Sequence, residues 1–218
     1  MLHLALLLAV AAAHTRLECP PPRSAKTGAK IGPCDAPDNL AQAPYPMHPG
    51  LNTITWLESL GHPGAPGRLA LSMDGSDDGL ETCILLDHIP HDEHSNPGGP
   101  GKELQYHRTS ITVWLPDIKC ERCNLQLITY MTDDIHSVPK GTKCVSPAAL
   151  DAGTVSSSHP KCSVVYHSCA PISIDGTTPR NDHVCDLAEH NKQLGWPFMD
   201  PATASGATET AMSTCACS

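Results

Sequence analysis

Hydrophobic and polar residues alternate in a series of short runs through the middle of the chain, and turn-forming residues separate these runs. Alternation with a period of two is typical of β-strands that bury one face. Residues 53–57 and 68–73 alternate in this way on either side of Gly61-His62-Pro63-Gly64, which predicts two strands around a turn or loop. Further strands are predicted at residues 83–86, 110–115, 125–130, 163–166 and 170–174.

The segments on both sides of these runs lack a clear period. Residues 14–49 are rich in Pro and Gly and predict an extended, irregular arm, whereas residues 186–194 could form one short helix. Residues 200–218 are rich in Ala, Thr and Ser, which is typical of a linker or tail. Short strands without long amphipathic helices favour an all-β fold, an immunoglobulin- or fibronectin-III-like β-sandwich with long loops.

Composition and charge narrow the range of partners. The 218 residues include 21 Pro and 16 Gly but only 4% aromatic residues, which suits one domain of short strands and turns. The formal net charge is −9, and the 14 basic residues are scattered along the chain. Because phosphate backbones are bound by clustered Lys and Arg, the sequence argues against nucleic acid as a partner and disfavours strongly polyanionic substrates.

The first residues predict export. An apolar run at residues 4–12 precedes Ala11 and Ala13, which place small side chains at the −3 and −1 positions of a signal-peptidase site. An N-terminal anchor or a misplaced start codon is the alternative. No other apolar run is long enough to span a bilayer, and eleven cysteines indicate an oxidising compartment. We therefore expect a secreted, extracellular protein that is not membrane-embedded.

The predicted organisation has three parts. They are a signal peptide at residues 1–13, a β-sandwich at residues 14–180 and a partly disordered C-terminal extension at residues 181–218. Cleavage after Ala13 makes His14 the first residue of the mature chain. Its α-amine and its imidazole can then chelate one metal ion, and Cu(II) favours tetragonal nitrogen coordination. A solvated terminus is the alternative interpretation of His14.

Three motifs strengthen the copper interpretation in combination. His14 is followed by Pro20-Pro21-Pro22-Arg23, His62 lies in Trp56-Leu57-Glu58-Ser59-Leu60-Gly61-His62-Pro63-Gly64, and Tyr166 precedes Cys169 and an alternating run. In this order the motifs resemble the lytic polysaccharide monooxygenases and their copper-binding relatives, in particular a group known only as polysaccharide-monooxygenase-like. The same group shares Gly32-Pro33-Cys34, Leu86-Asp87-His88-Ile89-Pro90 and Cys120-Glu121-Arg122-Cys123-Asn124-Leu125-Gln126-Leu127.

The resemblance implies a copper site and a reaction. His14 and His62 would hold copper in a histidine brace, and Tyr166 would lie at its axial side. The implied activity is copper-dependent oxidative cleavage of a polymeric carbohydrate, with an external electron donor and O₂ or peroxide as co-substrate. The protein would act as a monomer.

Two other functions stay open from the sequence. The first is a non-catalytic copper-binding or copper-handling protein with the same brace, and the second is an adhesion sandwich in which His14 is accidental. His48, in a second His-Pro-Gly, competes with His62 as a ligand, although His62 has the better strand context. Glu58 and His167 are candidates to contact the ligands, on sequence proximity alone.

Two further clusters could hold metals. His88, His91 and His94 could bind a second ion, but Pro90 breaks any helix that would align them, so a solvated acidic loop is favoured. Cys120 and Cys123, with Cys144 and Cys162, suggest a zinc knuckle or a redox pair.

Structural disulfides are favoured for these cysteines, with neighbouring cysteines of the strand bonded to different partners. Because the cysteine count is odd, at least one thiol has no partner within the chain, and Cys215 or Cys217 in the tail is the candidate. The cysteines expected to be paired are Cys19, Cys34, Cys83, Cys120, Cys123, Cys144, Cys162 and Cys169.

Overall fold

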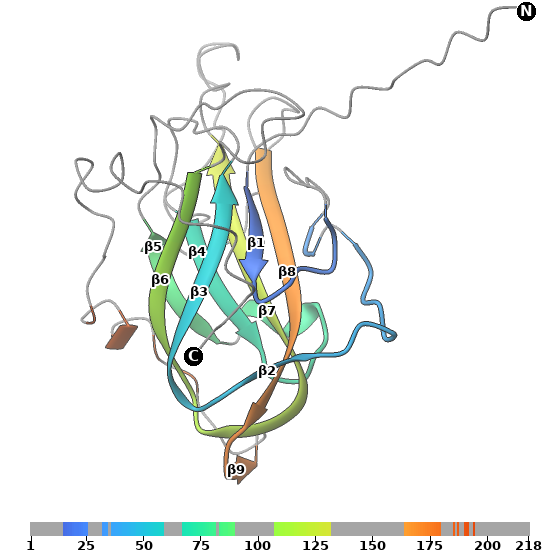
Figure 1. The fold of residues 1–218 in the computed structure, drawn as a ribbon, viewed down its shortest axis with the longest axis vertical. Coiled ribbons are helices and arrows are strands. Elements are labelled where there is room, and N and C mark those ends of the chain that lie inside the picture. The colour runs from blue at the N-terminus through green and yellow to red at the C-terminus, as the bar shows by residue number, and fades with distance from the viewer. Residues whose placement is uncertain are drawn as a thin grey trace, which may run out of the picture.

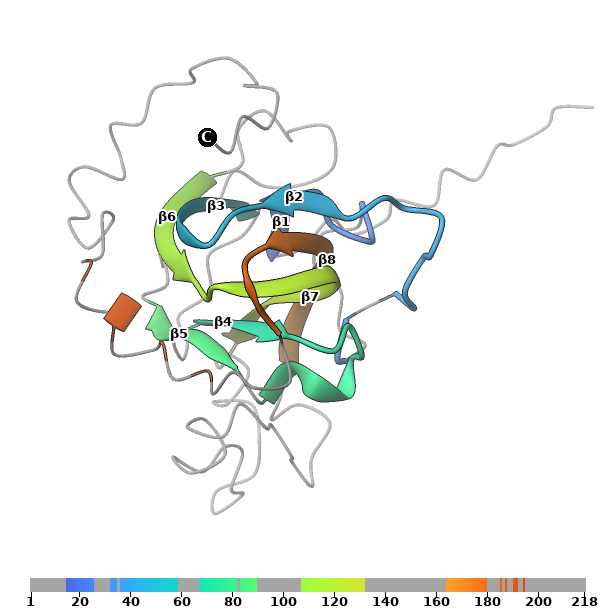
Figure 2. The same ribbon diagram turned by 90° about the horizontal axis from the view of Figure 1, so that it is seen from below.

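Two β-sheets pack face to face in a sandwich (Figure 1 and Figure 2). The structure is a computed structural model that describes residues 15–25, 32–34, 36–58, 67–81, 83–89, 107–131 and 164–179. It also describes Cys185, Leu187, His190, Asn191 and Leu194. The all-β sandwich predicted from the alternating runs is confirmed.

The smaller sheet has three strands in the order β1 (Thr15–Cys19), β3 (Gly50–Glu58) and β6 (His107–Leu115), all antiparallel. The larger sheet has the order β2 (Tyr45–Met47), β8 (Val164–Asp175), β7 (Ile118–Met131), β4 (Gly67–Ser72) and β5 (Ile84–Ile89). A short strand β9 (Thr178–Pro179) pairs with β7, and a 3-10 helix η1 (Asp78–Glu81) follows β4. A helical hydrogen bond from the N–H of Asn191 to the carbonyl of Leu187 lies in the region predicted as a short helix.

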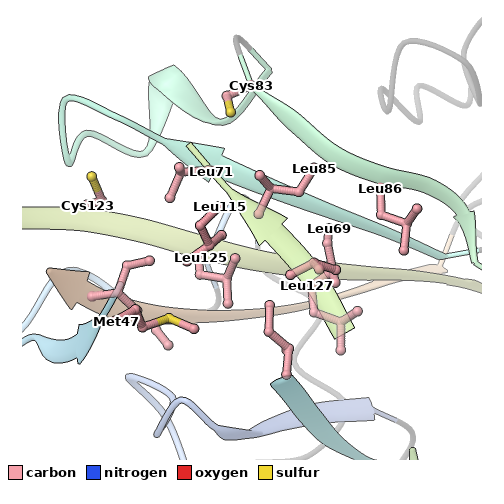
Figure 3. Close-up of a cluster of buried hydrophobic side chains, with 14 of the residues drawn as sticks. Met47, Leu69, Leu71, Cys83, Leu85, Leu86, Leu115, Cys123, Leu125 and Leu127 are labelled. Atoms are coloured by element: carbon pink, nitrogen blue, oxygen red, sulfur yellow. The ribbon is translucent and has the colours of Figure 1, made fainter. Parts of the chain in front are cut away.

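Alternate residues of the strands fill the space between the sheets. In the smaller sheet Ile54, Ile111 and Val113 are buried, and in the larger sheet Leu69 and Leu125 meet them. Figure 3 shows the leucine side chains of the larger sheet converging on this core. Burial of one such side chain stabilises the fold by about 1.5–3 kcal/mol, so this core is the main source of stability.

The predicted irregular arm contains two strands, and here the prediction is wrong. β1 alternates buried and half-buried residues over only five positions, and Leu17 is fully buried against the larger sheet. β2 has three residues, and it pairs in parallel with the end of β8. Both strands are too short to show a period in a segment rich in proline. β8 is also one continuous strand where two runs were predicted.

Three disulfides join described residues, namely Cys34–Cys169, Cys83–Cys185 and Cys120–Cys123. Cys19 is disulfide-bonded as well. Pairing is thus confirmed for six of the eight expected cysteines, and Cys144, Cys162, Cys215 and Cys217 lie outside the described residues. The partner of Cys83 was not anticipated, because Cys185 lies in the predicted tail.

Cys120 and Cys123 are bonded to each other, so the expectation of different partners is wrong. Cys120 pairs with Ile174 and Cys123 with Ile172, so the β7 segment between the cysteines is one residue longer than the facing segment of β8. The extra residue makes a β-bulge, and the bulge turns both sulfurs toward the carbonyl of Met73. With both thiols consumed, these two residues cannot serve as zinc ligands.

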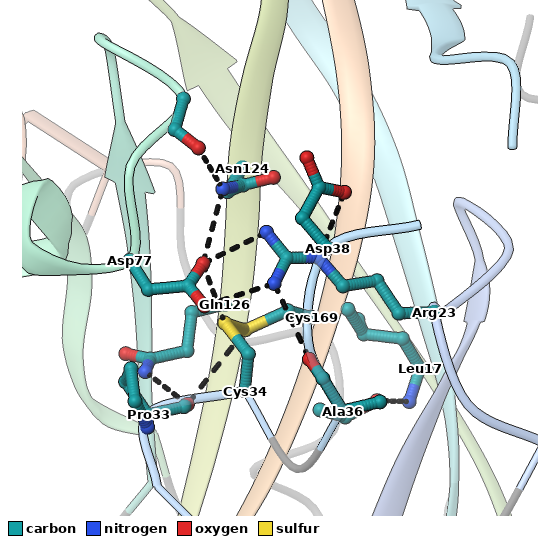
Figure 4. The surroundings of a disulfide bond; sticks show 12 residues. Leu17, Arg23, Pro33, Cys34, Ala36, Asp38, Asp77, Asn124, Gln126 and Cys169 are labelled. Atoms are coloured by element: carbon teal, nitrogen blue, oxygen red, sulfur yellow. Dashed lines mark hydrogen bonds and ion pairs between the residues drawn. A yellow bond between two sulfur atoms is a disulfide. The ribbon is translucent and has the colours of Figure 1, made fainter. Parts of the chain in front are cut away.

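The arm after β1 is fastened to the outer face of the larger sheet, as Figure 4 shows. The guanidinium of Arg23, which has no exposed side-chain surface, makes two hydrogen bonds to the carboxylate of Asp77, at 2.8 and 3.1 Å. Its Nε lies 3.6 Å from Asp38, which also accepts two hydrogen bonds from Arg122. The hydrogen bond from Arg122, with the charge of Arg23, holds the pKa of Asp38 below its ordinary value. The Cys34–Cys169 disulfide lies beside this network.

The C-terminal extension closes one seam between the sheets. Asn191 is 1% exposed, and its side-chain amide donates to the carbonyl of Leu85 in β5 at 2.7 Å. The same amide accepts from the N–H of Trp114 in β6 at 2.5 Å and donates to its carbonyl at 3.2 Å. A single side chain thus bridges the edge strands of both sheets, and residues beyond position 180 form part of the packed unit.

Candidate functional site

The end of the sandwich at which β1 begins gathers several strand ends. Thr15, the first residue of β1, pairs with Glu58, the last residue of β3, and Glu58 pairs with His107 at the start of β6. In the other sheet, Arg68 near the start of β4 pairs with Ile128 near the end of β7. Figure 1 shows these strand ends together at the top of the molecule, which we call the β1 end.

Tyr166 lies at the β1 end, on the face of β8 that looks toward the smaller sheet. It pairs with Thr129 of β7 and is 2% exposed. Two residues further along β8, the hydroxyl of Ser168 accepts a hydrogen bond from the N–H of Leu17 at 3.0 Å. β1 and β8 run in the same direction (Figure 1), and Thr15 and Tyr166 each lie two residues before this hydrogen bond, so they lie level across the space between the sheets.

The two predicted copper ligands, His14 and His62, lie outside the described residues. In the sequence His14 directly precedes Thr15, and His62 follows Glu58 by four residues and precedes Gly67 by five. The described flanks of both histidines therefore belong to the β1 end.

His48, the competing ligand, lies at the opposite end of the sandwich. Its side chain is 75% exposed, and its Nδ1 lies 3.0 Å from each carboxylate oxygen of Asp175, the last residue of β8. Tyr166 and Asp175 are nine residues apart in one extended strand, about 31 Å at the usual rise per residue. His48 and Tyr166 therefore cannot share a metal ion.

Glu58 and His167, the two residues named from sequence proximity, differ in position. Glu58 is buried at the β1 end, beside Thr15. His167 points to the other face of the larger sheet from Tyr166, because neighbours in a strand alternate. Its ring lies against Gly32, where an added Cβ atom would approach it to 3.2 Å. His167 therefore lies on the opposite face of the larger sheet from Tyr166, and its suggested contact with the copper ligands stays a prediction.

Buried polar groups at the β1 end were missed by the sequence analysis. Thr15 and Thr129 are buried there, and the hydroxyl of Thr15 has no hydrogen-bond partner among the residues that the structure describes. A buried hydroxyl without a partner costs free energy. Polar residues at the core-facing positions of otherwise apolar strands were the signal that could have identified this end.

The described part of the chain contains no cluster of three or more His, Cys, Asp or Glu side chains arranged to hold a metal ion. His88 lies in β5, and its side chain, like His91 and His94, is outside the described residues. The solvated loop favoured for these histidines therefore stays a prediction, and the second metal site stays its alternative. None of the described helices is long and apolar enough to cross a membrane.

Comparisons with known proteins give structural neighbours only. No family model matches the chain, and no curated protein matches it. Among solved structures, a lytic polysaccharide monooxygenase AA15 from Thermobia domestica in the Cu(I) state has a TM-score of 0.42 and 16% identity, over 69% of this chain and 79% of that one.

Two further structures match at lower TM-scores. A cellulose-active polysaccharide monooxygenase from M. thermophila has a TM-score of 0.36 and 13% identity, over 82% of this chain and 75% of that one. The extended catalytic domain of an H. jecorina lytic polysaccharide monooxygenase has a TM-score of 0.27 and 15% identity, over 67% and 57%. These structures carry the same family name as the resemblance in the sequence, but at this similarity they establish neither membership nor ligand nor activity.

Proposed function

We propose that this chain is a secreted copper protein whose mature N-terminus, His14, holds the metal together with His62, and that it oxidatively cleaves a polysaccharide. The observation that carries the proposal is that Thr15, Glu58 and Tyr166 all lie at the β1 end. Thr15 and Glu58 flank the predicted ligands His14 and His62, and Tyr166 is the third predicted site residue. The disulfides support secretion, because such bonds persist in oxidising compartments.

Chain length supports the pairing of the two histidines. Thr15 and Glu58 are register partners, so their Cα atoms lie about 4.5–5.5 Å apart in a regular antiparallel pair. His14 is one Cα step of about 3.8 Å from Thr15, and the four residues from Glu58 to His62 span at most about 14 Å. The covalent chain thus allows both imidazoles to reach one point at the β1 end.

The chemistry of the β1 end suits a metal with nitrogen ligands. Cleavage before His14 would give an α-amine with a pKa of about 7.7–8.0, which a metal ion deprotonates easily. The hydroxyl of Thr15 is buried without a hydrogen-bond partner among the described residues, so it is available for a hydrogen bond to a group bound beside the α-amine. Tyr166 is held by its burial in β8 and would shield one side of the site. Bound copper would supply one-electron redox chemistry, driven by an external electron donor.

Copper affinity of processed variants tests the site. Protein that begins at His14 should bind Cu(II) at least ~100-fold more tightly than protein with one extra N-terminal residue, about 2.7 kcal/mol, because an amide nitrogen replaces the amine. His62→Ala should lose affinity comparably. His48→Ala is the matched control, since His48 is exposed at the opposite end, and it should bind as the parent does. Titration by calorimetry or fluorescence measures all four.

Equal affinity with and without the extra residue would remove the terminal amine from the site and overturn the proposal. Activity is tested separately, on copper-loaded protein with ascorbate and a panel of polysaccharides, by mass spectrometry of oxidised oligosaccharides. Tight copper binding without oxidised products would favour the copper-handling alternative over the enzyme.

A further inference from the structure

One outer surface of the sandwich carries neutral, hydrogen-bonding side chains beside an exposed indole. In the smaller sheet, residues whose side chains point away from the core pair across β3 and β6: Leu51 with Trp114, Thr53 with Thr112, and Thr55 with Ser110. We call these six residues the hydroxyl face. Trp114 is 40% exposed and Leu51 is 57% exposed, and they are two of the four large exposed hydrophobic side chains among the described residues.

Trp114 is held in place from several directions. Asn191 binds both its backbone N–H and its backbone carbonyl. Gly50, at a φ of +94°, lies beneath the indole, where an added Cβ would sit 3.8 Å from the ring. The ring of His190 meets the indole edge-on, with 5.4 Å between centroids. An aromatic side chain that is already immobilised loses little conformational entropy when it binds a ligand.

The absence of charged side chains from the hydroxyl face restricts the chemical class of ligand that it can bind. None of its six residues is ionisable, in a chain of net charge −9. The nearest paired row along the sheet holds Arg108, which is neutralised by Glu18 at 2.9 Å. Hydroxyl groups both donate and accept hydrogen bonds, as the contact of 2.9 Å between Thr55 and Ser110 illustrates. An uncharged face of hydroxyls beside an apolar ring complements a neutral polyhydroxylated chain, and none of its six side chains would form an ion pair with a polyanion.

We infer that the hydroxyl face binds a neutral polysaccharide chain, with a sugar ring against Trp114 and further sugar hydroxyls on Thr53 and Thr112. The inference takes its ligand class from the proposed function. Trp114 lies seven residues along β6 from His107, about 24 Å from the β1 end. The face is therefore a second contact with the polymer, one that would anchor the protein while the β1 end performs the chemistry.

Polymer binding without copper tests the inference. Full-length protein, treated with EDTA and without reductant, is mixed with suspensions of microcrystalline cellulose and of chitin, and the fraction that remains in solution is measured. The parent should bind at least one of them. Trp114→Ala and Thr112→Glu should each weaken binding at least ~10-fold, because one removes the ring and the other places a charge on the neutral face. Leu40→Ala, at an exposed apolar residue of the arm, is the control and should bind within ~2-fold of the parent.

Three outcomes would overturn the inference: a parent protein that neither polymer removes from solution, Trp114→Ala and Thr112→Glu variants that bind as the parent does, or a Leu40→Ala variant weakened as much as Trp114→Ala. If circular dichroism shows that Trp114→Ala is unfolded, Thr112→Glu decides alone, since Thr112 is exposed and outside the core. Copper titration of the same variants separates the two proposals. Variants that keep their copper affinity but lose polymer binding would support the inference that the hydroxyl face binds the polymer. Polymer binding by a parent protein that binds no copper would overturn the proposed function and leave this inference standing.

Discussion

The two sheets share one core, but their outer faces differ. On the larger sheet, Ser72, Asn124 and Gln126 point away from the core and are nevertheless buried, because the arm and η1 cover them. On the smaller sheet, Thr53, Thr112 and their neighbours occupy equivalent outward positions and remain at least partly exposed. Alternation in the sequence is alike in both sheets. The pattern therefore reveals which face of a strand meets the core, and it does not reveal whether the other face meets water.

The covering of the larger sheet is polar, and this explains its hydrogen-bond network. Gln126 donates to the carbonyl of Pro33 at 2.7 Å, and Asn124 donates to Gly75 and to Asp77. Burial of such groups costs free energy unless hydrogen bonds replace the lost water. The arm supplies partners as well as cover, and the Cys34–Cys169 disulfide keeps it in place.

Two arginine–carboxylate pairs give the sharpest test of this difference. Arg23 and Asp77 pair under the arm, whereas Arg108 and Glu18 pair on the smaller sheet, also through two hydrogen bonds. We expect Arg23→Ala to lower the free energy of unfolding by about 1.5–3 kcal/mol, because it removes charge-assisted hydrogen bonds made by a guanidinium that has no exposed surface. Arg108→Ala, the matched control, should cost about 0–1 kcal/mol, since water replaces that partner. Urea denaturation measures both, and equal losses would show that the two faces are energetically alike.

Lowering the pH should weaken the same network, with a smaller loss of stability than Arg23→Ala causes. The hydrogen bonds from Arg122 and the charge of Arg23 lower the pKa of Asp38, and hydrogen bonds from Ser72 and Ser76 lower that of Asp74. A carboxyl whose pKa is depressed on folding contributes stability that is present above its unfolded value, near 3.8, and is lost as the pH falls through the folded value. Stability should therefore decline progressively below about pH 5.

The Asp38→Asn variant isolates the part that belongs to the network. It should be less stable than the parent at pH 7, and the gap between the two proteins should narrow as the pH falls below 4, because protonation removes the same charge from the parent. Thermal unfolding at a series of pH values follows this gap. A constant gap from pH 7 to pH 2 would mean that the charge of Asp38 contributes nothing.

The sequence predicted the strands of the core and missed the strands of the arm that covers the larger sheet. The core strands were found because residues such as Ile111, Val113 and Leu115 alternate with polar ones over a full strand. β1 and β2 were missed because their pairing is set by distant segments, as in the parallel pairing of Met47 with Ile174. Tyr166 was predicted as the last residue of one strand, which left His167 between two runs. The opposite directions of Tyr166 and His167 follow only once β8 is known to continue through both residues.

The smallest expected effect lies on the hydroxyl face, and it separates stability from binding. Thr112 is exposed and outside the core, so Thr112→Ala should change the free energy of unfolding by less than about 0.5 kcal/mol. Thr112 still has a role if the face binds sugar, because its hydroxyl lies between the Trp114 row and the Thr55 row. A threonine on a merely solvated sheet surface would show neither a stability change nor a binding change on substitution to alanine. We expect unchanged urea denaturation together with measurably weaker retention on the polymer that the parent binds. A stability loss above 1 kcal/mol would instead place Thr112 in a packed environment, and the contrast between the two outer faces would disappear.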